Sequence, residues 1–125
     1  VNFGKGIINI NFLINYDWEW DLENKASKDI PRIVKINEYE TSIRPEKHML
    51  IVPHVNKPSM IAQVAKVIGG NNINIGSMNV VQKNDKHETE SIMVINIDSV
   101  VDDKTLGAIS EIDGVHNPKY VNLTV

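Results

Sequence analysis

Apolar and polar residues alternate in the first part of the chain. Between Ile14 and Leu22 every second residue is apolar and the residues between them are polar. A period of two is typical of a strand with one buried and one exposed face. The polar stretch 23–29 predicts a loop, and apolar runs at 32–36 and 39–43 predict a hairpin that Pro45 closes. The first 47 residues are therefore expected to form a β-rich extension.

The strand predicted at 14–22 carries both tryptophans, Trp18 and Trp20. Two interpretations stay open. The strand is half-buried in this chain, or its aromatic residues dock on a partner or on a neighbouring domain.

From residue 48 onward, short apolar runs alternate with helical spacing. Met49–Val55 predicts a strand, and Asn56-Lys57-Pro58 predicts the start of a helix that Gly69-Gly70 ends. Its apolar residues recur at helical spacing: Met60, Ile61, Val64, Val67 and Ile68. Strands at 73–81 and 90–98, joined by a polar turn at 82–88, are expected to pair as a hairpin. A second helix starts at Asp102-Asp103 and ends at Gly114, and 115–125 predicts a final strand.

The predicted order from residue 48 is strand, helix, strand, strand, helix, strand. This order is typical of the ferredoxin-like βαββαβ fold, whose right-handed crossovers place both helices on one face of an antiparallel sheet. The other face must be covered by something else. The expected fold class is therefore α+β, with a ferredoxin-like domain at 48–125 after a β-rich extension or connector at 1–47.

Composition narrows the possible functions. The chain has 125 residues, enough for one core domain with an appendage, and its net charge of −3 provides no basic field for nucleic acid or an anionic membrane. The absence of cysteine excludes disulfides, thiol catalysis and cysteine-ligated zinc, and is ordinary for a cytoplasmic protein. The apolar residues before Ile14 are interrupted by Asn9 and Asn11, so neither a signal peptide nor a membrane span is expected. Because the chain begins with Val1, we expect a processed product or part of a longer protein.

Catalytic and metal-binding groups are not expected. Ser59 has no neighbouring base and no G-x-S-x-G elbow, and both arginines precede the βαββαβ unit. His48 and His54 would lie roughly 20 Å apart along one strand, at about 3.3 Å per residue. None of the four histidines has the ligand spacing of a metal site: His48, His54, His87 and His116.

A binding site for a small molecule needs fewer specific groups than a catalytic site, and the loop at 54–59 offers such groups. This loop leads into a predicted helix, whose free N–H groups and dipole favour a carboxylate. Asn56 and Asn74 carry amide oxygens that can accept an ammonium group, and His54 can hydrogen-bond a ligand hydroxyl or carboxylate. In the alternative interpretation, Asn56 only caps the helix and Asn74 only turns the chain.

These residues carry a resemblance. The segments HMLIVPHVNKPSMIAQVAKVIGGNNINIGSMNV, ESIMVINID and EIDGVHNPKYVNL resemble an ACT domain, in particular the C-terminal regulatory domain of D-3-phosphoglycerate dehydrogenases. The resemblance extends over 48–125. PRIVKINEYETSIRPE resembles the connector before that domain, and FGKGI resembles part of the same region, whereas 8–29 matches no pattern of the family.

The resemblance implies that L-serine binds between paired ACT domains of a homodimer and inhibits the enzyme. By position, His54, Asn56, Pro58 and Ser59 match the loop that meets the ligand, and Asn74 matches the asparagine offered at the dimer interface. The family often has glycine where this chain has Ser59, and a serine side chain would narrow the pocket. The chain lacks the nicotinamide fingerprint and the catalytic histidine of the dehydrogenase reaction, so no cofactor is expected.

Three alternatives remain. The chain also resembles the ACT domain of an iron–sulfur L-serine dehydratase. An ACT-like domain without ligand would serve dimerisation alone, through an edge strand at Ser77–Gln82. A small enzyme on the same fold is disfavoured, because no nucleophile and base are paired in the sequence.

Overall fold

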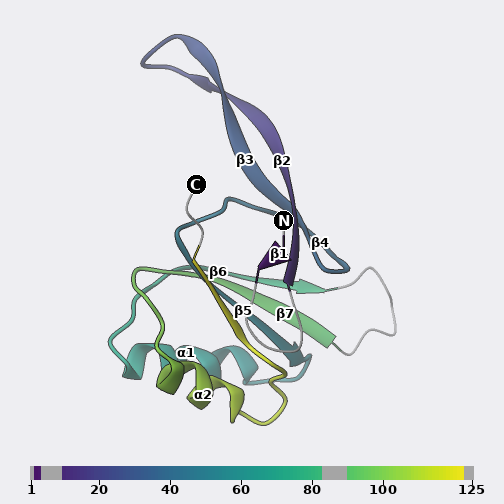
Figure 1. Ribbon diagram of the computed structural model, residues 1–125, viewed down its shortest axis with the longest axis vertical. Coiled ribbons are helices and arrows are strands. Elements are labelled where there is room, and N and C mark those ends of the chain that lie inside the picture. Colours follow the sequence, from purple (N-terminus) through teal and green to yellow (C-terminus); the bar gives the residue numbers. More distant parts are fainter. Residues whose placement is uncertain (1, 4–9, 83–89, 123–125) are drawn as a thin grey trace.

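The structure, a computed structural model, describes residues 2–3, 10–82 and 90–122 (Figure 1). It contains two four-stranded antiparallel sheets and two helices. The first sheet has the order β1(Asn2–Phe3), β2(Ile10–Asp21), β3(Ala26–Ile36), β4(Tyr39–Ile43). The second comprises β5(His48–Val55), β6(Ile75–Gln82), β7(Glu90–Ile97) and β8(Lys119–Asn122), in the order β6-β7-β5-β8. With α1(Met60–Gly70) and α2(Asp103–Ser110) between its strands, this sheet has the predicted βαββαβ order, and the α+β, ferredoxin-like fold class is confirmed.

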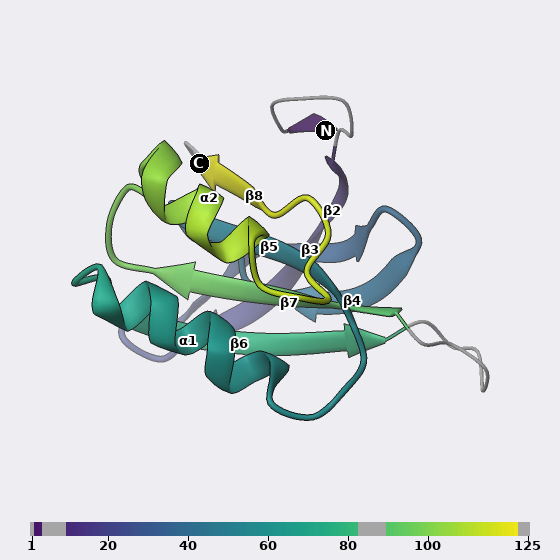
Figure 2. The same ribbon diagram turned by 90° about the horizontal axis from the view of Figure 1, so that it is seen from below.

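Both helices cover one face of the second sheet (Figure 2). Val64, Ile68 and Ile109 on these helices are fully buried, whereas Ile61, which the spacing placed on the apolar face of α1, is 49% exposed. Each such buried side chain contributes about 1.5–3 kcal/mol when it leaves water. These buried residues pack in one cluster with the sheet residues Leu50, Val52, Met93, Ile95 and Ile97.

The opposite face of the second sheet is covered by the hairpin β3–β4. Ile33 and Ile36 are fully buried there. They belong to a cluster that also contains Tyr39, Ile43, Met49, Ile51, Ile92, Val94 and Val121. The face that the fold leaves open is therefore covered by the N-terminal extension of the same chain. The predicted boundary between 1–47 and 48–125 falls in the connection from β4 to β5.

The long hairpin β2–β3 corrects one prediction. Residues 26–29, expected in a loop, belong to β3, and the turn occupies 22–25 with Leu22 exposed. The pairing of β2 with β3 extends from Asp21↔Ala26 to Phe12↔Ile36, and its register shifts once, between Leu13 and Ile14. Pairing with β2 gives these polar residues ladder hydrogen bonds, and such tertiary context overrides a weak strand propensity. The pair projects from the rest of the molecule (Figure 1). The side chains of Trp18 and Trp20 lie outside the described part, so neither interpretation of that strand is tested.

Several predicted ends also need correction. Gly69 and Gly70 lie inside α1, and Asn72, with φ 60°, takes the left-handed position after it. Such a position suits Asn because its short polar side chain tolerates the left-handed region. The helix α2 ends at Ser110, and Gly114, with φ 96°, forms the turn that follows. The expected final strand is shorter than 115–125, since β8 covers Lys119–Asn122.

Asp102 starts α2 as expected, because its carboxylate accepts a hydrogen bond from the Thr105 N–H at 2.8 Å. The predicted turn at 82–88 lies outside the described residues except for Gln82, and so does the chain after Asn122. The hairpin β6–β7 is confirmed. Neither described helix is long and apolar enough to cross a membrane.

Candidate functional site

The loop 56–59 between β5 and α1 contains three of the predicted site residues, and a fourth, His54, lies near the end of β5. Asn56, Pro58 and Ser59 are exposed. The N-cap is Ser59 and not Asn56, so the interpretation of Asn56 as a helix cap is wrong. Pro58 correspondingly precedes the helix and does not occupy its first turn.

The start of α1 is open to an anion. Ser59 makes no capping hydrogen bond through its side chain, and the first turn contains no acidic residue. The Ser59 hydroxyl instead accepts a hydrogen bond from Gln63 Nε2 at 3.1 Å. The first N–H groups of a helix have no partner within the helix and carry a partial positive charge. A ligand carboxylate therefore finds donors and a favourable field here.

Ser59 has a left-handed backbone, with φ 67° and ψ 0°. This conformation costs an L-residue free energy and is free of that cost for glycine. Glycine would therefore fit this backbone better than serine does. Ser59 therefore keeps the conformation of the loop and adds a side chain to it.

The loop is fixed to the turn after α2. Val55 N–H donates to the Gly114 carbonyl at 2.8 Å, and Lys57 Nζ lies 3.2 Å from Asp113 Oδ2. A side chain at position 114 would meet Lys57, since a Cβ there would lie 3.1 Å from Lys57 Cε. The absence of a side chain at Gly114 thus allows the two loops to approach.

His54 lies under this loop and is 3% exposed. Its Nδ1 lies 3.2 Å from the Val52 carbonyl oxygen. Because a carbonyl only accepts, Nδ1 carries the proton in this hydrogen bond, which leaves Nε2 of the neutral ring as an acceptor. His54 Nε2 can therefore accept a hydrogen bond from a ligand hydroxyl.

Ser91 is a buried polar neighbour of His54. The two residues are register partners on β5 and β7, and Ser91 is fully buried with a hydroxyl that has no hydrogen-bond partner. Strand alternation places both side chains on the face that the helices cover, together with Val52 and Met93. Ser91 was not among the residues predicted for the site. Its signal is a hydroxyl residue inside an otherwise apolar strand.

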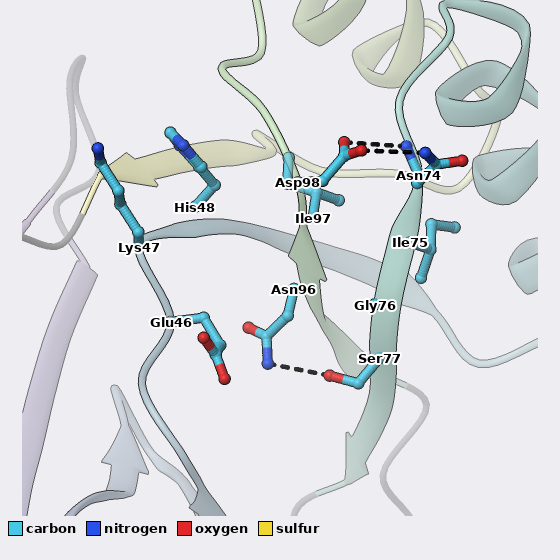
Figure 3. A pocket seen from close by; sticks show the side chains of 10 residues that line it. All are labelled: Glu46, Lys47, His48, Asn74, Ile75, Gly76, Ser77, Asn96, Ile97 and Asp98. Atoms are coloured by element: carbon cyan, nitrogen blue, oxygen red, sulfur yellow. Dashed lines mark hydrogen bonds between the residues drawn. The ribbon is translucent and has the colours of Figure 1, made fainter.

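At the other end of the sheet, Asn74 is held by Asp98 (Figure 3). Asn74 N–H donates to Asp98 Oδ1 at 3.1 Å, and Asn74 Nδ2 donates to Asp98 Oδ2 at 3.0 Å. A carboxylate accepts from the NH₂ group only, so the amide oxygen of Asn74 is directed away from Asp98. The hydrogen bonds from Asn74 lower the pKa of the Asp98 carboxyl below its ordinary value. An oriented amide oxygen beside an ionised carboxylate is suited to an ammonium group.

Asn74 and Asp98 line a cavity of about 460 Å³ between the ends of β6 and β7 and the residues that enter β5 (Figure 3). Polar side chains of Glu46, Ser77 and Asn96 also face it. Asn96 Nδ2 donates to Ser77 Oγ at 2.9 Å, while its buried Oδ1 has no partner. No group of histidine and acidic side chains in the described ranges is arranged to hold a metal ion.

The structure does not bring all the predicted site residues together within one chain. His54 pairs with Ser91 near one end of β7, and Ile75, next to Asn74, pairs with Ile97 near the other. Six residues along β7 correspond to roughly 20 Å, at about 3.3 Å per residue. The loop at 54–59 and Asn74 therefore form two separate groups at opposite ends of the sheet.

Comparisons with known proteins find relatives for most of the chain. It is 33% identical over 93 residues to D-3-phosphoglycerate dehydrogenase of Methanocaldococcus jannaschii, and 34% identical over 92 residues to that of Archaeoglobus fulgidus. The enzyme of Bacillus subtilis is 28% identical over 92 residues. The chain is homologous to part of the D-3-phosphoglycerate dehydrogenases. The resemblance predicted from sequence is thereby confirmed.

Each alignment covers 74% of this chain but only 17 or 18% of the relative's length. The chain thus corresponds to a small part of a phosphoglycerate dehydrogenase. No family model matches it.

Proposed function

We propose that this chain is a non-catalytic regulatory module of a cytoplasmic phosphoglycerate dehydrogenase, and that it binds L-serine between two copies of itself. One observation carries the proposal. The groups suited to a carboxylate and a hydroxyl lie at one end of the sheet, and the group suited to an ammonium lies at the other. A symmetric dimer unites two such halves.

The outer strand β6 provides the means of pairing. It is an end strand of its sheet, so its outer edge presents unpaired N–H and C=O groups, which invite another strand. Val80 on this strand and Ile61 on α1 are exposed apolar residues, 40% and 49% accessible. Burying them would contribute to a side-by-side interface.

Antiparallel pairing of two β6 strands about a two-fold axis sets their relative direction. It places Asn74 of one copy beside the C-terminal end of β6 of the other. That end lies on the side of the sheet where β5 ends and α1 begins (Figure 2). Asn74 of the second copy would then face the loop 54–59, and the symmetry would produce two equal sites.

Each functional group of L-serine then meets a matching group. The carboxylate faces the N–H groups at the start of α1, and the hydroxyl donates to His54 Nε2. The ammonium is accepted by the amide oxygens of Asn56 and of Asn74 from the second copy, next to the negative charge of Asp98. Pro58 and Ser59 shape the loop around the ligand.

Regulation follows from the position of the site. A ligand held by both copies stabilises the paired arrangement more than the separated one, and this differential affinity is the source of coupling. Coupling free energies of this kind are typically about 1–3 kcal/mol.

Isothermal titration with L-serine, with sedimentation recorded alongside, tests the proposal. Glycine lacks the hydroxyl and L-phenylalanine is too large, so we expect saturable heat from L-serine and much weaker binding of the other two. Asn56→Ala and Asn74→Ala are each expected to weaken L-serine binding without loss of the fold. If both variants bind L-serine as the wild type does, the site is assigned wrongly.

A dimerisation module without ligand is the second candidate. It is favoured by the exposed Val80 on the outer strand and by the existing hydrogen bonds of Asn74 to Asp98. A folded dimer that releases no heat with any of the three amino acids would support this candidate and overturn the first.

A further inference from the structure

The turn after α2 is built around an aspartate that is followed by a glycine. The Val115 N–H donates to the Ile112 carbonyl at 3.0 Å, so Asp113 and Gly114 are the two central residues of a β-turn. Gly114 has a φ of 96°, which glycine adopts without steric cost. The Asp113 side chain is 99% exposed. The turn therefore presents a carboxyl group to solvent directly before a residue without a side chain.

The peptide group between Asp113 and Gly114 is not held by hydrogen bonds. Among the described residues, neither the Asp113 carbonyl nor the Gly114 N–H has a hydrogen-bond partner. The groups on either side are bonded, since the Gly114 carbonyl accepts from the Val55 N–H at 2.8 Å and the Val115 N–H closes the turn. Rotation of this one peptide group therefore breaks no hydrogen bond, and it allows the Gly114 nitrogen to turn toward the Asp113 side chain.

The ion pair of Asp113 with Lys57 does not prevent this approach. Lys57 Nζ lies 3.2 Å from Asp113 Oδ2, but both side chains are accessible, 39% and 99%. An ion pair exposed in this way contributes little to stability. The carboxyl group therefore leaves Lys57 easily, and it can then meet the Gly114 nitrogen.

We propose that Asp113–Gly114 is a site of spontaneous isoaspartate formation. The Gly114 nitrogen attacks Cγ of the protonated Asp113 carboxyl group, and the amide proton leaves with the carboxyl hydroxyl as one water molecule. The product is a five-membered cyclic imide. One water molecule then opens the ring: attack at Cγ restores aspartate, and attack at the former main-chain carbonyl leaves the chain linked through Cγ. The isomer has the same mass as the original chain, and no other reactant is needed.

The isomer loosens the end of β5, because the main chain gains one carbon between α2 and Gly114. The Gly114 carbonyl is then displaced from the Val55 N–H, and so is the next contact, where the His116 N–H donates to the Pro53 carbonyl at 2.9 Å. Both hydrogen bonds hold the end of β5, which leads into the loop 56–59. One consequence rests on the proposed serine site: a displaced loop binds L-serine more weakly.

Incubation of the 125-residue chain at pH 6 and 37 °C tests the chemical step. Digestion with trypsin places position 113 in the fragment 105–119 and position 98 in the fragment 87–104. Electron-transfer fragmentation distinguishes isoaspartate from aspartate in each. Asp98, which precedes Ser99, is the internal control, because Asn74 donates to both of its carboxylate oxygens. The same chain unfolded in guanidinium chloride gives the rate that each local sequence has without structure.

We expect Asp113 to isomerise in the folded chain within about threefold of its rate in the unfolded chain, since a turn with few hydrogen bonds opens at little cost. At Asp98, folding should slow the reaction about tenfold or more, because two hydrogen bonds must break first. Asp113→Glu keeps the carboxylate but would need a six-membered ring, so it should form no isomer at this position. Protection of Asp113 by folding as strong as that of Asp98 would overturn the proposal.

The effect on the loop is measured on fresh and incubated chains side by side, with Asp113→Glu treated identically. Hydrogen exchange of the Val55 amide should become faster in the incubated wild type, in proportion to its isoaspartate content, and should not change in Asp113→Glu. Titration of the same samples with L-serine should lose sites in the same proportion.

The two readouts separate this proposal from the proposed function. If the fresh chain binds no L-serine, the proposed function fails, whereas the Val55 amide still reports on the loop. Unchanged exchange at Val55 in the isomerised chain would overturn the predicted loosening of β5.

Discussion

Replacement of Ser59 by glycine tests the strain in the loop before α1. With φ 67° and ψ 0°, Ser59 occupies the left-handed region, where an L-residue loses about 1–2 kcal/mol. Glycine removes this cost but has more freedom in the unfolded chain, which costs about 0.5–1 kcal/mol. Ser59→Ala is the reference, because alanine loses the hydroxyl but keeps the strained Cβ. We therefore expect Ser59→Gly to be more stable than Ser59→Ala by about 0.5–1 kcal/mol.

Urea unfolding of both variants measures this difference as a shift in midpoint at constant slope. Ser110 provides a matched control, because it is exposed and ends α2 without a positive φ. There the order should reverse, with Ser110→Gly less stable than Ser110→Ala by about 0.5–1 kcal/mol. If glycine is no better than alanine at position 59, the left-handed strain assigned to Ser59 is refuted. L-serine binding by Ser59→Gly should be at least as tight as that of the wild type, because the side chain no longer narrows the loop.

Three further predictions concern other single residues. Gly69→Ala should raise the free energy of unfolding by about 0.5–1 kcal/mol, since Gly69 lies in α1 with no atom within 4 Å of an added Cβ. Gly114→Ala should lower the free energy of unfolding, because Gly114 has a φ of 96°. The midpoint of urea unfolding should therefore rise for the first variant and fall for the second. Ser91→Ala should leave stability unchanged or higher, since it removes a buried hydroxyl that has no partner, and a clear loss of stability would show that the hydroxyl is bonded. Asp98 has a lowered pKa in the folded chain, so its contribution to stability is present above pH 3.8 and is lost as the pH falls further; Asp98→Asn should therefore lose less stability over that acidic range, and an unchanged pH profile would contradict the Asn74 interaction.

Local pattern predicted most of the second sheet and its helices. The spacing of Val64 and Ile68 indicated the buried face of α1, and the apolar runs indicated β5 and β7, because these elements bury continuous faces. The start of β3 at Ala26 could not be predicted this way. Its residues are polar, and they form a strand because β2 lies beside them.

The site was predictable in its residue types but not in its arrangement. The loop after β5 and Asn74 follow from their places at the ends of predicted elements. The roles of Ser91 and Asp98 depend on register, which pairs Ser91 with His54 and brings Asp98 to Asn74 across the sheet. The left-handed backbone of Ser59 is likewise invisible in the sequence, since serine seldom adopts it.

In the proposed dimer, each serine site combines the loop of one copy with Asn74 of the other. A mixture of Asn56→Ala and Asn74→Ala chains, unfolded and refolded together, tests this most directly. Each variant alone has two damaged sites per dimer, but a mixed dimer has one site with an intact Asn56 and an intact Asn74. Random pairing makes half of the dimers mixed, so titration with L-serine should recover about a quarter of the wild-type sites at wild-type affinity. If the mixture binds no better than the two variants measured separately, the site is not shared between copies and the account is wrong.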